Sequence, residues 1–298
     1  MEITKKEENI TIIRKTYKII KERYAIHGNS IHSVNFKNIN ISDEECEKIN
    51  CKLQTIRQDF TKILIMMNRI EKIYSEYQNE TYKANYTSAI GNEAEEELGC
   101  IIEYLFSKYR VIIEYIFQIL EILIPIKFNE KESLEYLKLK KWHKKHRFLI
   151  KYLENKIGNK DNLINMEWFQ QIRVDRDFII HDGATCLVFG DKKELLFKVM
   201  TTGALDKEEE IQDDFFSTNN NLIKYTYFWG LKISKLIIFC ETIFDFLSDN
   251  FEVENENMYF FEKFFKKQSL ISSDGEELSG LQDVLLRILE KIISSEDK

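Results

Sequence analysis

Three side chains close together in the sequence have the chemistry of a site that cleaves phosphodiesters. Arg176 is followed directly by Asp177, and four residues separate Arg176 from His181. On a helix, Asp177 and His181 lie on one face because they are four positions apart. A carboxylate there holds one imidazole N–H and leaves the other nitrogen to move a proton. A guanidinium offers a permanent positive fork for phosphate oxygens. With RNA, the 2′-hydroxyl can be the nucleophile without a metal.

This motif resembles that of the HEPN superfamily of prokaryotic nucleotide-binding and RNase domains. The stretch from Arg176 to His181 matches the R-x4-H form, in a chain of helical character. The resemblance covers residues 94–250. It implies a helical bundle that pairs as a homodimer with both motifs in one cleft. It also implies a metal-independent endoribonuclease in toxin–antitoxin or anti-phage defence, with RNA as substrate and a protein antitoxin or regulator as a further partner.

The chain differs from the family pattern at two positions. Asp177 stands where asparagine is common, and Gly183 stands where the antitoxin-paired subgroup has a tyrosine. These differences keep a second hypothesis open, a non-catalytic HEPN-like module that binds a nucleotide, RNA or a protein. A purely structural helix end is a third, with Arg176 paired to an acid and His181 near the C-terminal carbonyls.

A second group of residues is typical of single-stranded RNA contacts. Basic side chains surround an aromatic ring in the stretch 138–147, and an aromatic among cations can stack on a base. Arg173 lies one helical turn before Arg176, where it could contact a second phosphate. A solvated helix face, and an ion pair between Arg173 and Asp177, are the alternatives. The predicted RNA-binding residues are Arg173, Lys141, Trp142, Lys144, Lys145 and Arg147.

A polar stripe accompanies the strongest apolar stripe of the sequence. Apolar side chains recur at helical spacing from Leu98 to Leu123, and Pro125 ends the run. Four charged residues share the opposite face, which is the ordinary polar face of an amphipathic helix; a role in lining a cleft is the alternative. They are Glu103, Arg110, Glu114 and Glu121.

The remaining pattern predicts a mainly α protein, a HEPN-like helical bundle with helical extensions and one small β-hairpin. Residues 184–189 and 194–200 are apolar runs around a glycine-containing turn, which predicts the hairpin. Ser42 and Glu45 have the spacing of a capping box. The helices expected from the apolar period span 10–24, 42–77, 98–123, 131–156, 166–181 and 220–250, with one or two more in 255–295. The polar stretch 78–92 predicts a linker. We therefore divide the chain into an N-terminal helical segment (1–90), the bundle (91–252) and a C-terminal helical segment (253–298).

Composition narrows the class of protein further. The 298 residues include 43 basic and 50 acidic side chains, a net charge of −7, which argues against a protein that coats DNA. The five cysteines have neither disulfide-framework nor zinc-site spacing. We expect no metal and no cofactor. Residues 1–10 have no signal-type apolar stretch, and charges interrupt the most apolar segments. The expectation is a cytoplasmic protein with no membrane partner.

Overall fold

The computed structural model is mainly helical, with one three-stranded antiparallel sheet, which confirms the predicted fold class at this level. It describes residues 5–22, 36, 39–79, 93–158, 161, 163–190, 194–200, 222–252 and 282–297. The predicted linker beyond residue 79 and the tail at 253–281 lie outside the described residues. The helices are α1 (Lys5–Glu22), α2 (Asp43–Asn79), α3 (Glu93–Leu123), η1 (Ile124–Lys127), α4 (Glu130–Leu137), α5 (Trp142–Ile157), η3 (Glu167–Phe169), α6 (Gln170–His181), α7 (Tyr225–Asn250) and α8 (Gln282–Glu296); the strands are β1 (Thr185–Gly190), β2 (Leu195–Met200) and β3 (Ile223–Lys224).

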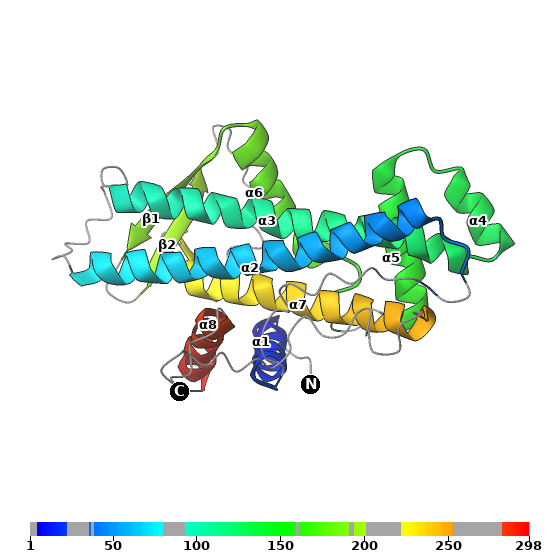
Figure 1. Cartoon of the computed structure of the whole chain (residues 1–298). Helices are drawn as coiled ribbons and strands as arrows, with labels where there is room; N and C mark the ends of the chain where they lie inside the picture. The colour runs from blue at the N-terminus through cyan, green and yellow to red at the C-terminus, as the bar shows by residue number, and fades with distance from the viewer. Residues whose placement is uncertain are drawn as a thin grey trace, which may run out of the picture.

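Three long helices form the body of the molecule. The helices α2, α3 and α7 run alongside one another, and α1 and α8 pack against α7 on the side away from α3 (Figure 1). The α3 apolar stripe meets α7 in a cluster of rings, where Phe106 and Trp229 have centroids 5.0 Å apart. Because α7 is covered by α3 and by α1 and α8, it is apolar almost all round.

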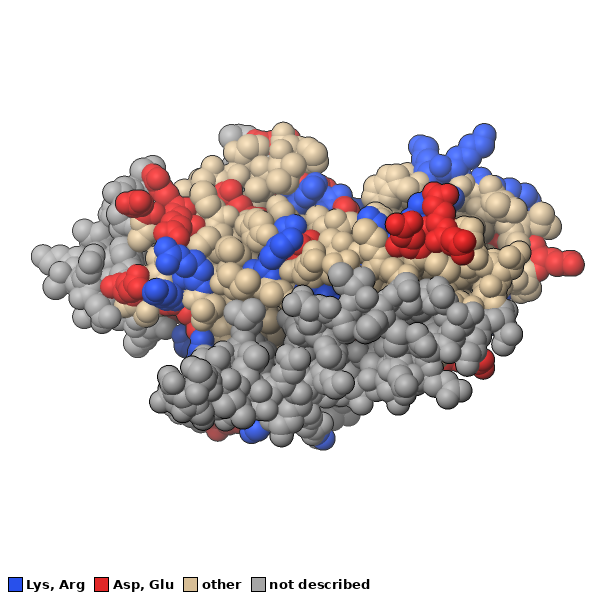
Figure 2. Space-filling model, viewed as in Figure 1, with Lys and Arg blue, Asp and Glu red and all other residues tan. Residues whose placement is uncertain are grey.

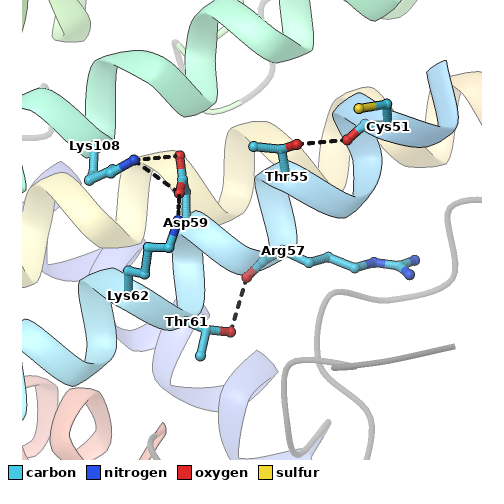
Figure 3. Close-up of polar contacts among 7 residues, drawn as sticks. All are labelled: Cys51, Thr55, Arg57, Asp59, Thr61, Lys62 and Lys108. Atoms are coloured by element: carbon cyan, nitrogen blue, oxygen red, sulfur yellow. Dashed lines mark hydrogen bonds and ion pairs between the residues drawn. The ribbon is translucent and has the colours of Figure 1, made fainter. Parts of the chain in front are cut away.

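A buried ion cluster joins α2 to α3. The Asp59 carboxylate on α2 is 1% exposed and accepts hydrogen bonds from Lys62 Nζ at 2.8 Å and from Lys108 Nζ at 3.1 and 3.2 Å (Figure 3). Lys108 comes from α3, so this contact crosses the interface. A buried carboxylate needs such partners, and this one fixes how α2 and α3 align.

The hairpin is confirmed and has an additional strand. Strands β1 and β2 pair antiparallel with Val188 opposite Phe197, and β3 adds to β2 with Ile223 opposite Phe197. The expected helix 220–250 therefore begins only at Tyr225. Gly99 on α3 is what lets the sheet approach, since a Cβ there would lie 2.5 Å from the Cys186 carbonyl oxygen.

The helix expected over 131–156 is in fact two helices. An Asn129 capping box starts α4, which ends at Leu137, and α5 starts at Trp142. Three of the four residues between them are lysines, and two more follow in the first turn of α5. In an unbroken helix these charges would lie three or four positions apart and repel one another. Such repulsion disfavours a single unbroken helix across this segment.

The helix cap that the sequence predicts at the start of α2 is observed. The Ser42–Glu45 capping box forms, with the Ser42 N–H bonded to Glu45 Oε2 at 3.1 Å and the Glu45 N–H to Ser42 Oγ at 3.3 Å.

Buried apolar residues of α1, α2, α3, α5, α7 and α8 belong to one continuous core, and the division at residues 90 and 252 stays a prediction. Within the described part, no helix has the length and apolarity needed to span a bilayer.

Candidate active site on helix α6

The helix α6 carries the R-x4-H motif and is fixed against α3 by its preceding turn. The indole of Trp168 donates to the Leu163 carbonyl at 2.8 Å and packs edge-on to Tyr109 of α3. Ile172 is fully buried on the same side. Gly183, with φ of +66°, ends the helix two residues after His181 in a conformation that favours glycine. The motif is thereby held on the outer face of a well-anchored helix.

Arg176 and His181 meet on this outer face. Arg176 Nη1 lies 3.4 Å from His181 Nε2, and the imidazole is exposed. A guanidinium has only donors, so this contact is a hydrogen bond in the tautomer whose ring proton is on Nδ1 and whose Nε2 accepts. The pair therefore places a guanidinium beside an imidazole nitrogen, and Nε2 can accept a substrate proton once Arg176 turns away from it, because its one lone pair faces Nη1.

The carboxylate of Asp177 has different partners from those that its spacing predicts. Among the described residues it makes no hydrogen bond to His181. Its Oδ1 atom accepts from Arg176 Nη1 at 3.2 Å and from Arg110 Nη1 of α3. Arg110, 15% exposed, also donates from Nε to Glu114 Oε1 at 2.8 Å. Asp177 thus lies between two guanidinium groups, and it positions Arg176 directly and His181 only through Arg176.

Donor groups of Arg176 are left over for a ligand. Its side chain is 20% exposed, and its Nε atom is buried with no hydrogen-bond partner among the described residues. A buried donor without a partner costs about 1–3 kcal/mol, which a bound acceptor would recover. Phosphate oxygens are the usual acceptors for such a fork.

The polar stripe of α3 is more than a solvent-facing surface. Glu103 accepts from the Cys186 N–H of β1 at 2.8 Å, Arg110 contacts α6, and Glu121 lies 3.1 Å from His146 Nε2 of α5. The His146 ring also stacks on Phe117 with centroids 4.4 Å apart. One face of α3 therefore positions the sheet, the motif helix and the basic helix.

The predicted RNA-binding segment surrounds the N-terminus of α5. Lys141, Lys144 and Arg147 are exposed, and Trp142 is 60% exposed. Lys145 instead lies over the Tyr136 ring at 5.3 Å. The surface is hollowed between α6 and the α4–α5 protrusion, with basic side chains in the hollow and on the protrusion (Figure 2).

The motif and this segment are separated by a short stretch of α3. Arg110 and Glu121 mark the two places and are eleven residues apart, so the sites lie about 16 Å apart along the helix axis. Arg173 is exposed, and no hydrogen bond or ion pair joins it to Asp177 or to another side chain of the described part. It stays available as a phosphate contact beside the motif.

A metal site, and a nucleophile at either buried cysteine, find no support in the described part of the chain. No three His, Cys, Asp or Glu side chains there gather as metal ligands would. Cys186 and Cys240 are buried, and burial raises the pKa of both thiols well above the ordinary value, which makes them poor nucleophiles.

Comparison of the chain with models of known protein families, with curated proteins and with solved structures gives no match. The functional interpretation therefore rests on the residues and contacts described above.

Proposed function

We propose that this protein is a metal-independent endoribonuclease of the HEPN type. The observation that carries the proposal is the contact between Arg176 Nη1 and the exposed His181 Nε2 at 3.4 Å, beside an Arg176 Nε atom without a partner. These groups place an exposed imidazole beside a partly buried guanidinium that keeps donors for a phosphate. A role in toxin–antitoxin or anti-phage defence follows from the resemblance alone.

In the proposed reaction, Arg176 turns from His181 to the phosphate, and His181 Nε2 then takes the proton of the 2′-hydroxyl. The 2′-oxygen then bonds to the neighbouring phosphorus, and the bond from phosphorus to the 5′-oxygen breaks. Arg176 stabilises the negative charge that develops on the phosphoryl oxygens. The leaving 5′-oxygen gains a proton from a protonated imidazole, so the products are a 2′,3′-cyclic phosphate and a 5′-hydroxyl end.

Asp177 need not repel the substrate in this scheme. Its charge is opposed by Arg110 on one side and Arg176 on the other. An opposite charge within a few ångströms reduces the field of a carboxylate at a phosphate position. Arg110 is in this proposal a positioning residue that α3 supplies to the motif.

A homodimer would supply the second imidazole. One copy of His181 serves as base and the other as acid when two motifs face each other. Ile180, next to His181, is 49% exposed, and an apolar side chain at this place suits a surface that a second copy covers. The basic segment of α5 would bind the RNA strand beyond the cut, by cation contacts and by stacking on Trp142.

A non-catalytic RNA- or nucleotide-binding module is the second candidate. The observation that favours it is the Arg176–Asp177 hydrogen bond at 3.2 Å, which partly neutralises the cation that catalysis needs. Such a module would bind RNA with a strong salt dependence and leave it intact.

The deciding test is cleavage of total cellular RNA by the full chain in excess chelator. The parent should produce 2′,3′-cyclic phosphate ends. His181→Ala should lower the rate at least about 100-fold, the lower range for a lost general acid–base, and retain RNA affinity. Asp182→Asn, an exposed neighbour outside the motif, is the matched control and should cleave like the parent. Intact RNA with parent and variant, together with salt-sensitive binding, would establish the second candidate.

A further inference from the structure

The large apolar side chains that stay exposed are concentrated in one part of the chain. Among the described residues there are seven of them, and four belong to the segment 126–142, which runs from η1 to the start of α5. Leu137 is the most exposed of the seven at 78%, and Leu134 and Trp142 follow at 60% each. Single apolar residues scattered over a surface need no explanation, but a group of them at one place indicates an interaction site.

The two leucines lie on the outer side of α4. The inner side is held by Tyr136, whose ring centroid is 5.4 Å from that of Phe128 and 5.7 Å from that of Phe148. Leu134 and Leu137 are three positions apart, so they share a side of the helix away from Tyr136. Polar side chains would serve the fold equally well at these positions, so the leucines indicate a contact outside the chain.

Lysines without a carboxylate partner surround these leucines. Lys131 and Lys138 are three positions before and four positions after Leu134, so both lie on its side of α4. Glu130 is the carboxylate on that side, and it lies in the first turn of the helix, where the helix dipole favours a negative charge. Five exposed lysines form no ion pair within the described part of the chain: Lys131, Lys138, Lys140, Lys141 and Lys144.

The α4–α5 protrusion is basic although the protein as a whole is acidic. Residues 126–147 include eight lysines and arginines and three glutamates, which gives a net charge of +5 in a chain of net charge −7. One of the glutamates, Glu132, is already used in the capping box of α4. Basic side chains project outward from the protrusion (Figure 2). This positive charge is therefore available to an anionic surface.

Lysines, leucines and a tryptophan on a protruding pair of helices are the combination that binds an anionic bilayer. Clusters of about four to eight cations on an amphipathic helix attract anionic headgroups, and apolar side chains on its other positions enter the acyl boundary. Tryptophan favours the interface between the two. An RNA strand would account for the lysines and for Trp142 but not for the exposed leucines. A fluid interface also needs no shaped pocket opposite the protrusion.

We propose that the α4–α5 protrusion docks on an anionic lipid surface. Leu134, Leu137 and Trp142 enter the boundary between headgroups and acyl chains, and the surrounding lysines pair with the headgroups. The contact is peripheral, since no helix of the described part can span a bilayer. The expectation of no membrane partner rested on spanning and signal-type segments, and a peripheral contact needs neither. Docking does not depend on ribonuclease activity at α6.

Tryptophan fluorescence can follow this contact at a single residue. The chain has three tryptophans, of which Trp168 and Trp229 are buried and Trp142 is 60% exposed. Vesicles of phosphatidylcholine with about 30% phosphatidylserine, added to the full chain, should shift the emission to shorter wavelength, because Trp142 leaves water. Vesicles of phosphatidylcholine alone should cause no shift. Trp142→Phe should abolish the shift while the protein still sediments with the anionic vesicles.

Two variants with matched controls separate insertion from attraction between charges. Leu134→Gln with Leu137→Gln keeps the helix propensity and should weaken sedimentation with anionic vesicles at least about 10-fold. Ile65→Gln, at an apolar position of α2 that is 42% exposed, should bind like the parent. Lys138→Glu should weaken binding about 10-fold at low salt. Lys151→Glu makes the same charge change at an exposed position farther along α5 and should weaken binding less than about 2-fold.

Three results would overturn the proposal. The first is a parent protein that does not bind the anionic vesicles, and the second is a Trp142 emission that neutral vesicles shift equally. The third is a leucine double variant that binds like the parent while Lys138→Glu does not, because a purely ionic contact, such as RNA makes, behaves in this way. Cleavage of RNA tests Arg176 and His181 separately, so neither experiment decides the other.

Discussion

Replacing Arg110 by methionine tests whether α3 contributes to the candidate active site. Methionine keeps much of the side-chain volume and leaves the Asp177 carboxylate with Arg176 alone. At a separation of about 5 Å and an effective dielectric constant of about 20, a carboxylate repels a phosphate charge by about 3 kcal/mol. Asp177 is 43% exposed, so solvent screening reduces this to about 1–2 kcal/mol. The expected loss of RNA cleavage is therefore about 5- to 30-fold.

The assay is single-turnover cleavage of a labelled RNA in chelator, with RNA affinity measured beside it. Adding Asp177→Asn to Arg110→Met should recover most of the loss, because no unopposed carboxylate is left. Arg69→Met is the control, since Arg69 forms a comparable but exposed pair with Glu97 of α3 at 2.9 Å. An unchanged rate and affinity in Arg110→Met would refute the reasoning. A loss that the double variant fails to recover would mean that Arg110 binds the RNA itself.

Three further predictions concern stability. Gly99→Ala should lower the free energy of unfolding by about 1–3 kcal/mol despite the better helix propensity of alanine, because its Cβ would meet a backbone oxygen at 2.5 Å. Gly230→Ala should lower the free energy of unfolding by less, since its added Cβ would meet flexible side chains instead of backbone. Chemical denaturation of both variants measures the difference. Asp59→Ala should lower the free energy of unfolding by about 1–3 kcal/mol, because it leaves two partly exposed lysines without their buried partner. Glu44→Gln is the control: it breaks an exposed ion pair and should leave the Tm nearly unchanged. Burial raises the pKa of Tyr136 to about 12, so the contribution of this phenol to the free energy of unfolding is complete below pH 10 and is lost between about pH 10 and 12. In Tyr136→Phe the free energy of unfolding should therefore fall less steeply over this pH range than in the parent. Identical pH profiles for the two proteins would contradict this.

The sequence was sufficient to predict features that depend on near neighbours. The apolar period from Leu98 to Leu123 predicted α3, and the Ser42–Glu45 spacing predicted a cap that forms. The hairpin was predicted because two apolar runs flank a turn. Each of these signals lies within one element or between adjacent ones, where local geometry decides the outcome.

Features that depend on distant segments could not be predicted. Arg110 and Asp177 are 67 positions apart, and nothing local distinguishes Arg110 from the other charges on its face. The spacing of Asp177 and His181 predicted a contact on one helix, yet a guanidinium from another helix competes for the same carboxylate. Strand β3 is only two residues long and forms because β2 presents an open edge beside it.

The four-residue polar stripe of α3 constrains the length of this helix, because the contacts that it makes must stay on one helical face. Inserting a single residue between Glu114 and Glu121 would turn the contact to His146 about 100° away from the contact to Asp177. Deleting seven of the ten residues between Arg110 and Glu121 would keep the phase to within about 20° while moving the two contacts about 10 Å closer together. Changes in the length of α3 that preserve both contacts are therefore restricted to near-heptad steps, so the spacing between the motif and the basic helix can change only in large increments.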